Sequence, residues 1–186
     1  MEKNTTDRAC VLVFAKISAA ISHEIKNTLS IINENAGLLE DYAHMAEDGG
    51  GVSPERVRSV TQTIAKQVDR SNTIMKNLNR FAHSADTCLA HGNLRETLSL
   101  VVALADRQAA MKNITISLEC PPDVALSTYL ISFESLVYLT LLTLFQSSAE
   151  GSALTIEAID EAPNVTLCFT IKLKDNITLD SYPDDD

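Results

Sequence analysis

The feature that most constrains the fold is a long run of apolar residues at helical spacing. Within residues 14–43, apolar side chains recur every three or four positions, which places them on one face of a single long helix. Glycines at 49–51 interrupt this pattern, and Ser53 followed by Pro54 has the residue types of a helix cap and a first helical position. The same spacing resumes over 57–82. The sequence therefore predicts two long helices joined by a short loop in an antiparallel hairpin.

The apolar stripes are wider than one neighbouring helix can cover. Ile31, Leu38 and Ile74 lie beside the main stripes and broaden them. Symmetric self-association is the commonest way to bury such a face. We therefore expect a homodimer in which two hairpins form a four-helix bundle.

The pattern changes in the second half of the chain. Asn93 and Glu96 have the spacing of a capping box at the start of a helix. Residues 113–120 alternate between apolar and polar, as a half-buried strand does, and 132–149 reads as a largely buried helix. Residues 153–173 alternate again around a turn. We expect a small α+β layer of two helices on about three strands.

These patterns divide the chain into two parts, and their charges differ. Residues 1–86 are expected to form the hairpin unit and residues 87–186 the α+β domain. The first part holds 10 basic and 11 acidic residues, and the second holds 5 and 14. The formal net charge of −10 disfavours nucleic acid as a partner, because its binding draws on clustered Lys and Arg. A protein partner is expected instead.

Cysteine spacing and hydropathy bear on the compartment. The four cysteines lie far apart without a Cys-x-x-Cys pair, so neither a zinc site nor a close-spaced disulfide framework is indicated. The longest apolar runs are shorter than the roughly 20 residues that a bilayer requires. We expect reduced thiols, a cytoplasmic location and no membrane attachment.

The stretch AAISHEIKNTLSIINEN places His23 beside Glu24 in the first long helix. The zinc-protease spacing His-Glu-x-x-His fails, because Asn27 stands where the second histidine is needed. His23 lies off the stripe formed by Ile21 and Ile25, so we expect its imidazole to face solvent. A neutral imidazole has an unprotonated nitrogen that can act as a nucleophile, and a carboxylate can fix its tautomer. This chemistry suits a phosphoryl acceptor; a plain surface histidine is the alternative interpretation.

The segment SHEIKNTL, from Ser22 to Leu29, resembles the H-box of two-component sensor histidine kinases. In that family the motif lies on the first helix of a dimerisation and phosphotransfer hairpin. The resemblance implies that His23 accepts phosphate, that Glu24 assists it, and that Asn27 orients a water molecule in the family's phosphatase reaction. Thr28 replaces the family's usual proline, which predicts a straighter helix.

The second half departs from the kinase pattern. An active kinase of this class has an asparagine that binds magnesium and glycine-rich phosphate loops. Here Leu144 stands about where that asparagine would fall, and after Gly92 the sequence holds one glycine, Gly151. We therefore expect no nucleotide site and no ATP-dependent kinase activity. The chain resembles the dimeric histidine phosphotransferases with degenerate kinase-like domains that occur in bacterial phosphorelays.

The resemblance implies a partner and a reaction. A phosphoryl group would pass between response-regulator aspartates through His23. The receiver domain would supply the carboxylate cluster and the Mg²⁺, so this chain needs no cofactor or metal of its own. A pseudokinase that acts as a phosphatase or sequestering partner of one response regulator is an alternative, with Glu24 and Asn27 orienting water. A scaffold that only dimerises is a third possibility.

The receiver is expected to dock between the two long helices, on the loop side of His23. Reversal of the chain near Gly50 would place His23 level with Asn79, and Ile31 level with Ser71. The residues predicted to contact the receiver are polar and apolar side chains along this groove: Lys26, Asn27, Ser30, Ile31, Glu34 and Leu38 from the first helix, and Gln67, Arg70, Ser71 and Ile74 from the second.

Overall fold

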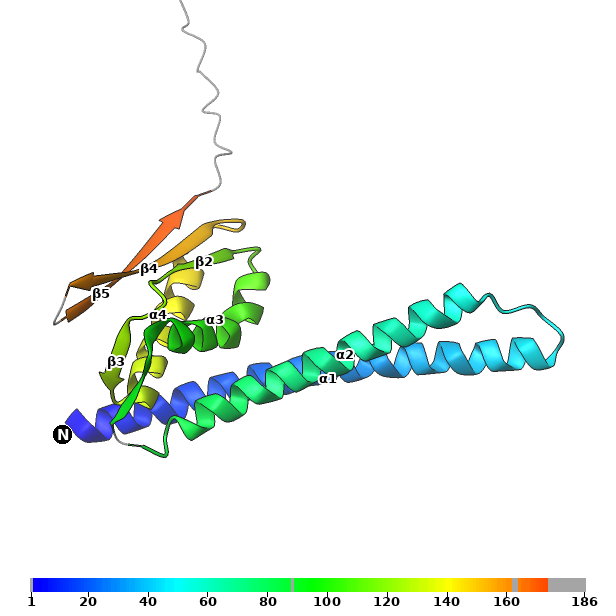
Figure 1. Ribbon diagram of the computed structural model, residues 1–186, viewed down its shortest axis with the longest axis horizontal. Helices are drawn as coiled ribbons and strands as arrows, with labels where there is room; N and C mark the ends of the chain where they lie inside the picture. Colours follow the sequence, from blue (N-terminus) through cyan, green and yellow to red (C-terminus); the bar gives the residue numbers. More distant parts are fainter. Residues whose placement is uncertain (1, 88, 162–163, 174–186) are drawn as a thin grey trace, which may run out of the picture.

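A long helical hairpin projects from a smaller α+β part in the computed structural model (Figure 1). The structure describes residues 2–87, 89–161 and 164–173. Helix α1 (Glu2–Glu47) and helix α2 (Pro54–His83) form the hairpin. The predicted pair of long helices is confirmed, and α1 continues without a break through Thr28.

Glycines close the C-terminal end of α1. Gly49 has φ of 78°, in the left-handed region that glycine adopts without steric cost. The N–H of Gly50 donates to the carbonyl oxygen of Met45 at 2.8 Å, and a Cβ on Gly50 would lie 2.7 Å from that oxygen. The helix therefore ends where the backbone requires glycine, and α2 begins directly at Pro54.

A pair of hydroxyl groups lies inside the hairpin and shows its register. Thr28 is 2% exposed and its Oγ1 lies 2.8 Å from Oγ of Ser71. Thr28, and not Ile31, therefore lies opposite Ser71, so the expected register is wrong by about one helical turn. The observed register lets the two hydroxyls satisfy each other among apolar side chains, where an unpaired hydroxyl is costly.

The α+β part contains two helices and two small sheets. In chain order its elements are β1 (Ala90–Asn93), α3 (Leu94–Ala110), β2 (Thr115–Glu119), β3 (Ala125–Thr128), α4 (Leu130–Ser147), β4 (Ala153–Glu161) and β5 (Asn164–Lys172). Strand β4 lies between β2, to which it is parallel, and β5, to which it is antiparallel. Strands β1 and β3 pair antiparallel as a separate sheet. The α+β class and the three predicted strands are confirmed.

Local signals in the sequence explain several of these elements. Asn93 caps α3, because its Oδ1 accepts a hydrogen bond from the N–H of Glu96 at 3.0 Å. At the other end of the domain, Lys112 Nζ donates to the carbonyl oxygens of Phe145 and Gln146 at 2.7 and 3.0 Å. This cation satisfies the last carbonyls of α4 and complements the helix dipole.

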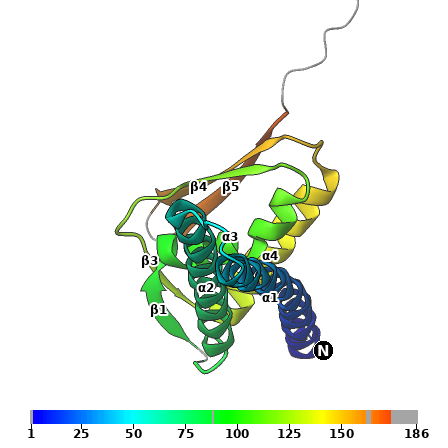
Figure 2. The ribbon, with the colours of Figure 1, turned by 90° about the vertical axis from the view of Figure 1, so that its right-hand side faces the viewer.

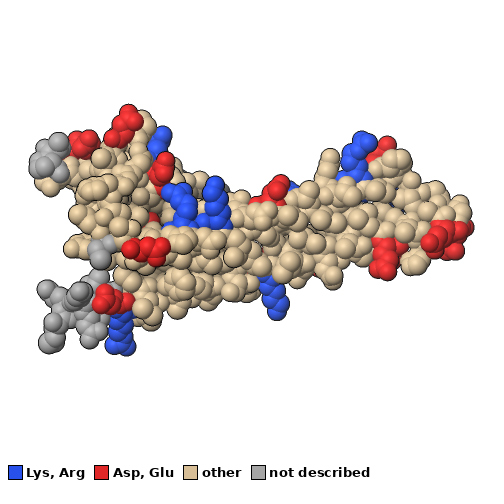
Figure 3. All heavy atoms as spheres, turned by 60° about the horizontal axis from the view of Figure 1, so that its bottom comes forward, with Lys and Arg blue, Asp and Glu red and all other residues tan. Residues whose placement is uncertain are grey.

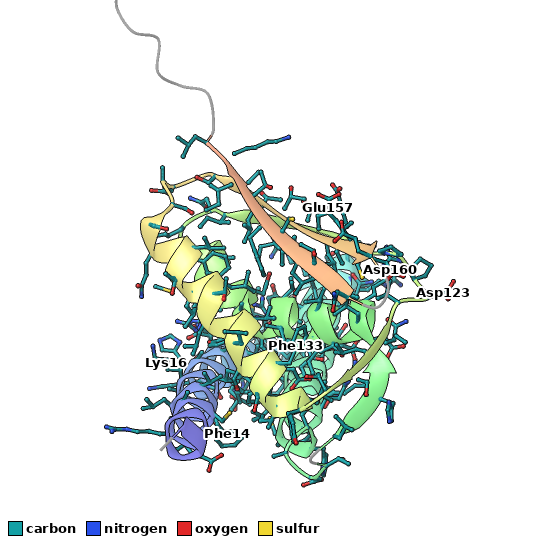
Figure 4. All side chains as sticks on the ribbon, turned by 90° about the vertical axis from the view of Figure 1, so that its left-hand side faces the viewer. Phe14, Lys16, Asp123, Phe133, Glu157 and Asp160 are labelled. Carbon is teal, nitrogen blue, oxygen red and sulfur yellow. The ribbon has the colours of Figure 1, made fainter. Side chains whose placement is uncertain are left out.

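The sheet β2-β4-β5 covers one side of α3 and α4, and the first half of α1 lies against their other side (Figures 1 and 2). Val13, Ile17 and Ile21 of α1 are buried in the same core as the helices and the sheet. Figure 4 views this end of the molecule, with Phe14 labelled on α1 and Phe133 on α4. The Phe14 ring also stacks on Phe81 of α2, with centroids 6.4 Å apart. The hairpin and the α+β part therefore share one hydrophobic core.

Helix α4 is long and apolar enough to cross a membrane, by length and composition alone. The core helix of a soluble protein can have the same length and composition. Here Val137, Tyr138 and Leu141 are buried in the shared core. This packing accounts for much of the apolar composition of α4, although Leu136 is 64% exposed.

One ionisable group on α4 is buried where the hairpin meets the α+β part. Glu134 is 1% exposed, and its Oε2 has no hydrogen-bond partner. Burial raises the pKa of Glu134 to about 7, and Ser84 and Arg80 partly oppose that rise. The carboxyl group of Glu134 borders a cavity of ≈ 640 Å³ that is also lined by Lys76 and His83.

We predict that Glu134 makes the fold less stable as the pH rises from 4.5 to about 7. The ordinary pKa of 4.5 applies to the unfolded chain and the raised pKa to the fold. Between these two pH values the folded state binds more protons than the unfolded state. The stabilising contribution of protonated Glu134 is therefore complete below pH 4.5 and lost above about pH 7. Glu134→Gln should exceed the stability of the wild type by about 2 kcal/mol at pH 8, because solvent screening in the adjoining cavity reduces the full linkage value of about 3 kcal/mol, and should match it at about pH 4.5. Urea denaturation at both pH values measures this; identical pH profiles would contradict it.

Candidate functional site

His23 lies on α1 where the hairpin passes under α3. Ile21 is 7% exposed, and Ile25 packs against the shared core. These two residues point inward, so His23 between them is exposed. The helix therefore presents the imidazole on its outer surface while its flanks are fixed by packing.

Glu24, the next residue, is held by an ion pair across the hairpin. Arg70 Nη2 donates to Glu24 Oε1 at 2.7 Å, with the glutamate side chain 19% exposed and the arginine side chain 56% exposed. In the part of the chain that the structure describes, Glu24 makes this contact and has no hydrogen bond to His23. The carboxylate is adjacent to the imidazole but is engaged elsewhere.

Arg107 reaches His23 from α3, a contact that no sequence pattern predicts. Its Nη1 lies 2.8 Å from Nδ1 of His23. An arginine side chain has donors only, so Nδ1 is the acceptor and the proton of the neutral imidazole sits on Nε2. The two residues are 84 positions apart, and no local pattern connects them. Their contact depends on how the last turn of α3 packs on the hairpin.

Two clefts adjoin the Glu24–Arg70 ion pair. One, of ≈ 540 Å³, opens between α1, α2 and α3, and its lining includes Ile74. The other, of ≈ 390 Å³, is lined by Asn27, Thr28, Ile31 and Gln67 of the hairpin and by Asp106, Arg107, Ala110 and Met111 of the α3 end. We call this second space the α3 cleft. Glu24, Arg70, Asp106 and Arg107 line both spaces.

The structure brings some of the predicted contact residues together and separates others. Asn27, Ile31, Gln67 and Arg70 meet in the α3 cleft, and Ile74 lies in the neighbouring one. Ser71 is directed at Thr28 inside the hairpin. The remaining four predicted residues lie away from both clefts: Lys26 and Ser30 border a shallow groove of α1 beside Leu29, and Glu34 and Leu38 are exposed nearer the loop.

The described residues offer little to a metal ion or to a disulfide. Within them, no group of three or more His, Cys, Asp or Glu side chains is placed to hold a metal ion. Cys10, Cys120 and Cys168 are free thiols. The chemistry that the site offers is that of an accessible imidazole flanked by one carboxylate and two guanidinium groups.

Comparisons with known proteins give structural similarity without sequence similarity. No family model matches the chain, and no curated protein matches it. The similar solved structures include three histidine kinases. One is AdeS of Acinetobacter baumannii, with 12% identity and a TM-score of 0.40, covering 78% of this chain and 70% of AdeS.

The alignments with the other two histidine kinases cover more of this chain and a smaller share of the kinase chains. A histidine kinase from Burkholderia phymatum has 18% identity and a TM-score of 0.39, over 85% of this chain and 64% of that one. The histidine kinase ThkA, in complex with the response regulator protein TrrA, has 17% identity and a TM-score of 0.40, over 90% and 48%. This chain thus spans about half the length of ThkA.

Proposed function

We propose that the protein is a histidine phosphotransferase of two-component signalling, passing a phosphoryl group between response-regulator aspartates through His23. The observation that carries the proposal is the exposed imidazole of His23, next to Glu24, on a helix whose inner face is packed. The resemblance of SHEIKNTL to an H-box supports it. Asn27 follows His23 by one turn, on the same side of α1.

The transfer step follows from ordinary nucleophilic catalysis. An imidazole nitrogen of His23 attacks the phosphorus of the receiver's aspartyl phosphate, forming an N–P bond as the acyl O–P bond breaks. The aspartate leaves as a carboxylate. The proton on the other imidazole nitrogen passes to Glu24 or to solvent, which leaves a phosphohistidine whose ring is uncharged and whose phosphoryl group is anionic. In this proposal a Mg²⁺ held by the receiver would neutralise the phosphoryl oxygens, and the chain would need no cofactor of its own.

The test is a transfer assay with receiver domains of the source organism, each loaded with radiolabelled acetyl phosphate and Mg²⁺. We expect label to move from one receiver to this protein and then to a second receiver. Release of label as inorganic phosphate, with none on the protein, would favour the phosphatase alternative. Label that stays on every receiver would favour the scaffold.

We expect the purified protein to bind no ATP and not to phosphorylate itself. Leu144 provides no magnesium ligand on α4, and Gly151 lies in the turn before β4 with φ of 78°. A phosphate-binding loop needs several glycines for close backbone approach. Isothermal titration with Mg-ATP checks this expectation, and a micromolar dissociation constant would refute it.

The proposed dimer is supported by apolar side chains that are exposed to solvent on the single hairpin. Val57, Val68 and Met75 share one face of α2 and are 37%, 44% and 44% exposed. On α1, Leu29 is 57% exposed. Figure 3 shows a face on which the middle of the hairpin is mostly uncharged and acidic side chains lie near the loop. A second hairpin would bury such a surface.

Val68→Glu is expected to weaken the homodimer by at least about tenfold, since a carboxylate would have to be desolvated in the bundle. Because Val68 is exposed on the single hairpin, the substitution should leave the helices folded. Ile32→Glu should act in the same direction, with some loss of hairpin stability, because Ile32 is half-buried. Sedimentation equilibrium measures the dissociation constant. Lys66→Glu, on the opposite side of α2, is the control; a monomeric wild type at micromolar concentration would contradict the dimer.

A further inference from the structure

We propose that Arg107 is a positioning residue that holds His23 in an unreactive state until α3 or the Arg107 side chain moves away. The inference rests on the proposed function, because it concerns the same imidazole. Its basis is the 2.8 Å contact from Arg107 Nη1 to His23 Nδ1. Through this contact, the α+β part controls whether the imidazole of His23 can accept a phosphoryl group.

The direction of the hydrogen bond decides which nitrogen of His23 can react. Arg107 donates and cannot accept, so the lone pair of Nδ1 is occupied. In a neutral imidazole the other nitrogen, Nε2, then carries the proton. Neither nitrogen therefore has a free lone pair, which the imidazole needs in order to attack phosphorus.

Both routes to a reactive imidazole require the contact to break. Attack by Nδ1 needs the lone pair that Arg107 occupies. Attack by Nε2 needs the proton to move to Nδ1, which would set an imidazole N–H against the guanidinium N–H of Arg107. The observed arrangement of His23 is therefore incompatible with the transfer step at either nitrogen.

Glu24 is held out of the reaction in the same state. A proton on Nδ1 would be stabilised by a neighbouring carboxylate. The oxygen Oε1 of Glu24 instead accepts from Arg70 at 2.7 Å. Two arginines, Arg70 from α2 and Arg107 from α3, thus engage the carboxylate and the imidazole separately.

Release of Arg107 does not require the core to open. Arg107 lines both clefts and is half-buried, whereas Leu104, Ala105 and Ala109 anchor α3 in the core. Its side chain has open space into which it can turn. The end of α3 also walls the α3 cleft, where Asn27, Ile31 and Gln67 are predicted to contact the receiver, so the same part of the chain restricts chemistry and docking.

The inference is tested with Arg107→Ala, the conservative Arg107→Lys, and Arg95→Ala as a control on the same helix. Long-range ¹H–¹⁵N spectra report the tautomer of His23, assigned by its absence in His23→Gln. We expect the Nε2–H tautomer in the wild type, Arg107→Lys and Arg95→Ala, and a mixture of tautomers in Arg107→Ala.

Phosphoramidate, which phosphorylates imidazoles directly, measures the reactivity of His23 without a receiver. We expect phosphohistidine to form about fivefold faster in Arg107→Ala, given the strength of a charged hydrogen bond at a half-exposed site.

Each outcome separates the inference from the proposed function. An unchanged tautomer in Arg107→Ala, or a reaction with phosphoramidate that is no faster than in the wild type, would overturn the inference while receiver transfer still occurs. A slower reaction in Arg107→Ala would also overturn it and would assign Arg107 to phosphoryl binding instead. Failure of every receiver to transfer, with the tautomer and phosphoramidate results as expected, would refute the proposed function and leave the masking of His23 supported.

Discussion

Replacing His23 with alanine is expected to abolish phosphate acceptance while leaving the fold and the receiver affinity unchanged. Alanine offers no nucleophile, so the loss should be complete. His23 is exposed, and its hydrogen bond to Arg107 is its one side-chain contact of this kind among the described residues. The free energy of unfolding should therefore change by no more than about 1 kcal/mol, the contribution of that one exposed hydrogen bond. Label transfer, thermal melting and receiver binding measure the three properties.

His44→Ala is the matched control for this variant. His44 is also exposed on α1, and its imidazole lies 3.5 Å from Glu47 near the loop. Transfer to His44→Ala should equal that of the wild type. Phosphate on His23→Ala at the wild-type rate would contradict the role of His23.

Ile31→Glu is expected to weaken receiver binding by about tenfold and to slow transfer accordingly, because a small transient interface loses much when a carboxylate replaces a contact side chain. Ile31 is half-buried and lines the α3 cleft with Asn27 and Gln67. His23 itself is untouched, so saturating receiver should restore most of the rate. Titration of the transfer rate against receiver concentration separates affinity from chemistry.

Met45→Glu provides the control for Ile31→Glu, since Met45 is 46% exposed near the hairpin loop. It makes the same kind of replacement at a distance from the clefts and should bind the receiver normally. Arg70→Glu should also reduce transfer, but it breaks the 2.7 Å pair with Glu24 as well as altering the cleft. A normal affinity in Ile31→Glu would show that the docking face lies elsewhere.

The helices were predictable because their signals are local. Periodic apolar residues define α1 and α2, glycines end α1, and Asn93 with Glu96 starts α3. Strands β1 and β3 were missed because each has four residues, too few to show an alternating pattern. Their pairing depends on chain segments that only the folded domain brings together.

The register and the site depended on packing that periodicity does not encode. Loop length alone placed Ile31 opposite Ser71, whereas the hydroxyl pair sets Thr28 there. The exposure of His23 followed from its place on the helical wheel. Arg107 could not be found, because its approach is set by the docking of α3. The burial of Glu134 was likewise hidden, since a single carboxylate in an apolar helix gives no sign of which way it faces.

The central claim is that a receiver's phosphoryl group becomes attached to His23. Its most direct test is to quench the reaction of the wild-type protein with a phosphorylated receiver, digest it under alkaline conditions, and locate the phosphate by mass spectrometry. We predict one phosphate on the peptide containing His23, stable in base and labile in acid, as a phosphoramidate bond requires. A protein that carries no phosphate while the receiver loses its own, or phosphate attached to another residue, would contradict the account.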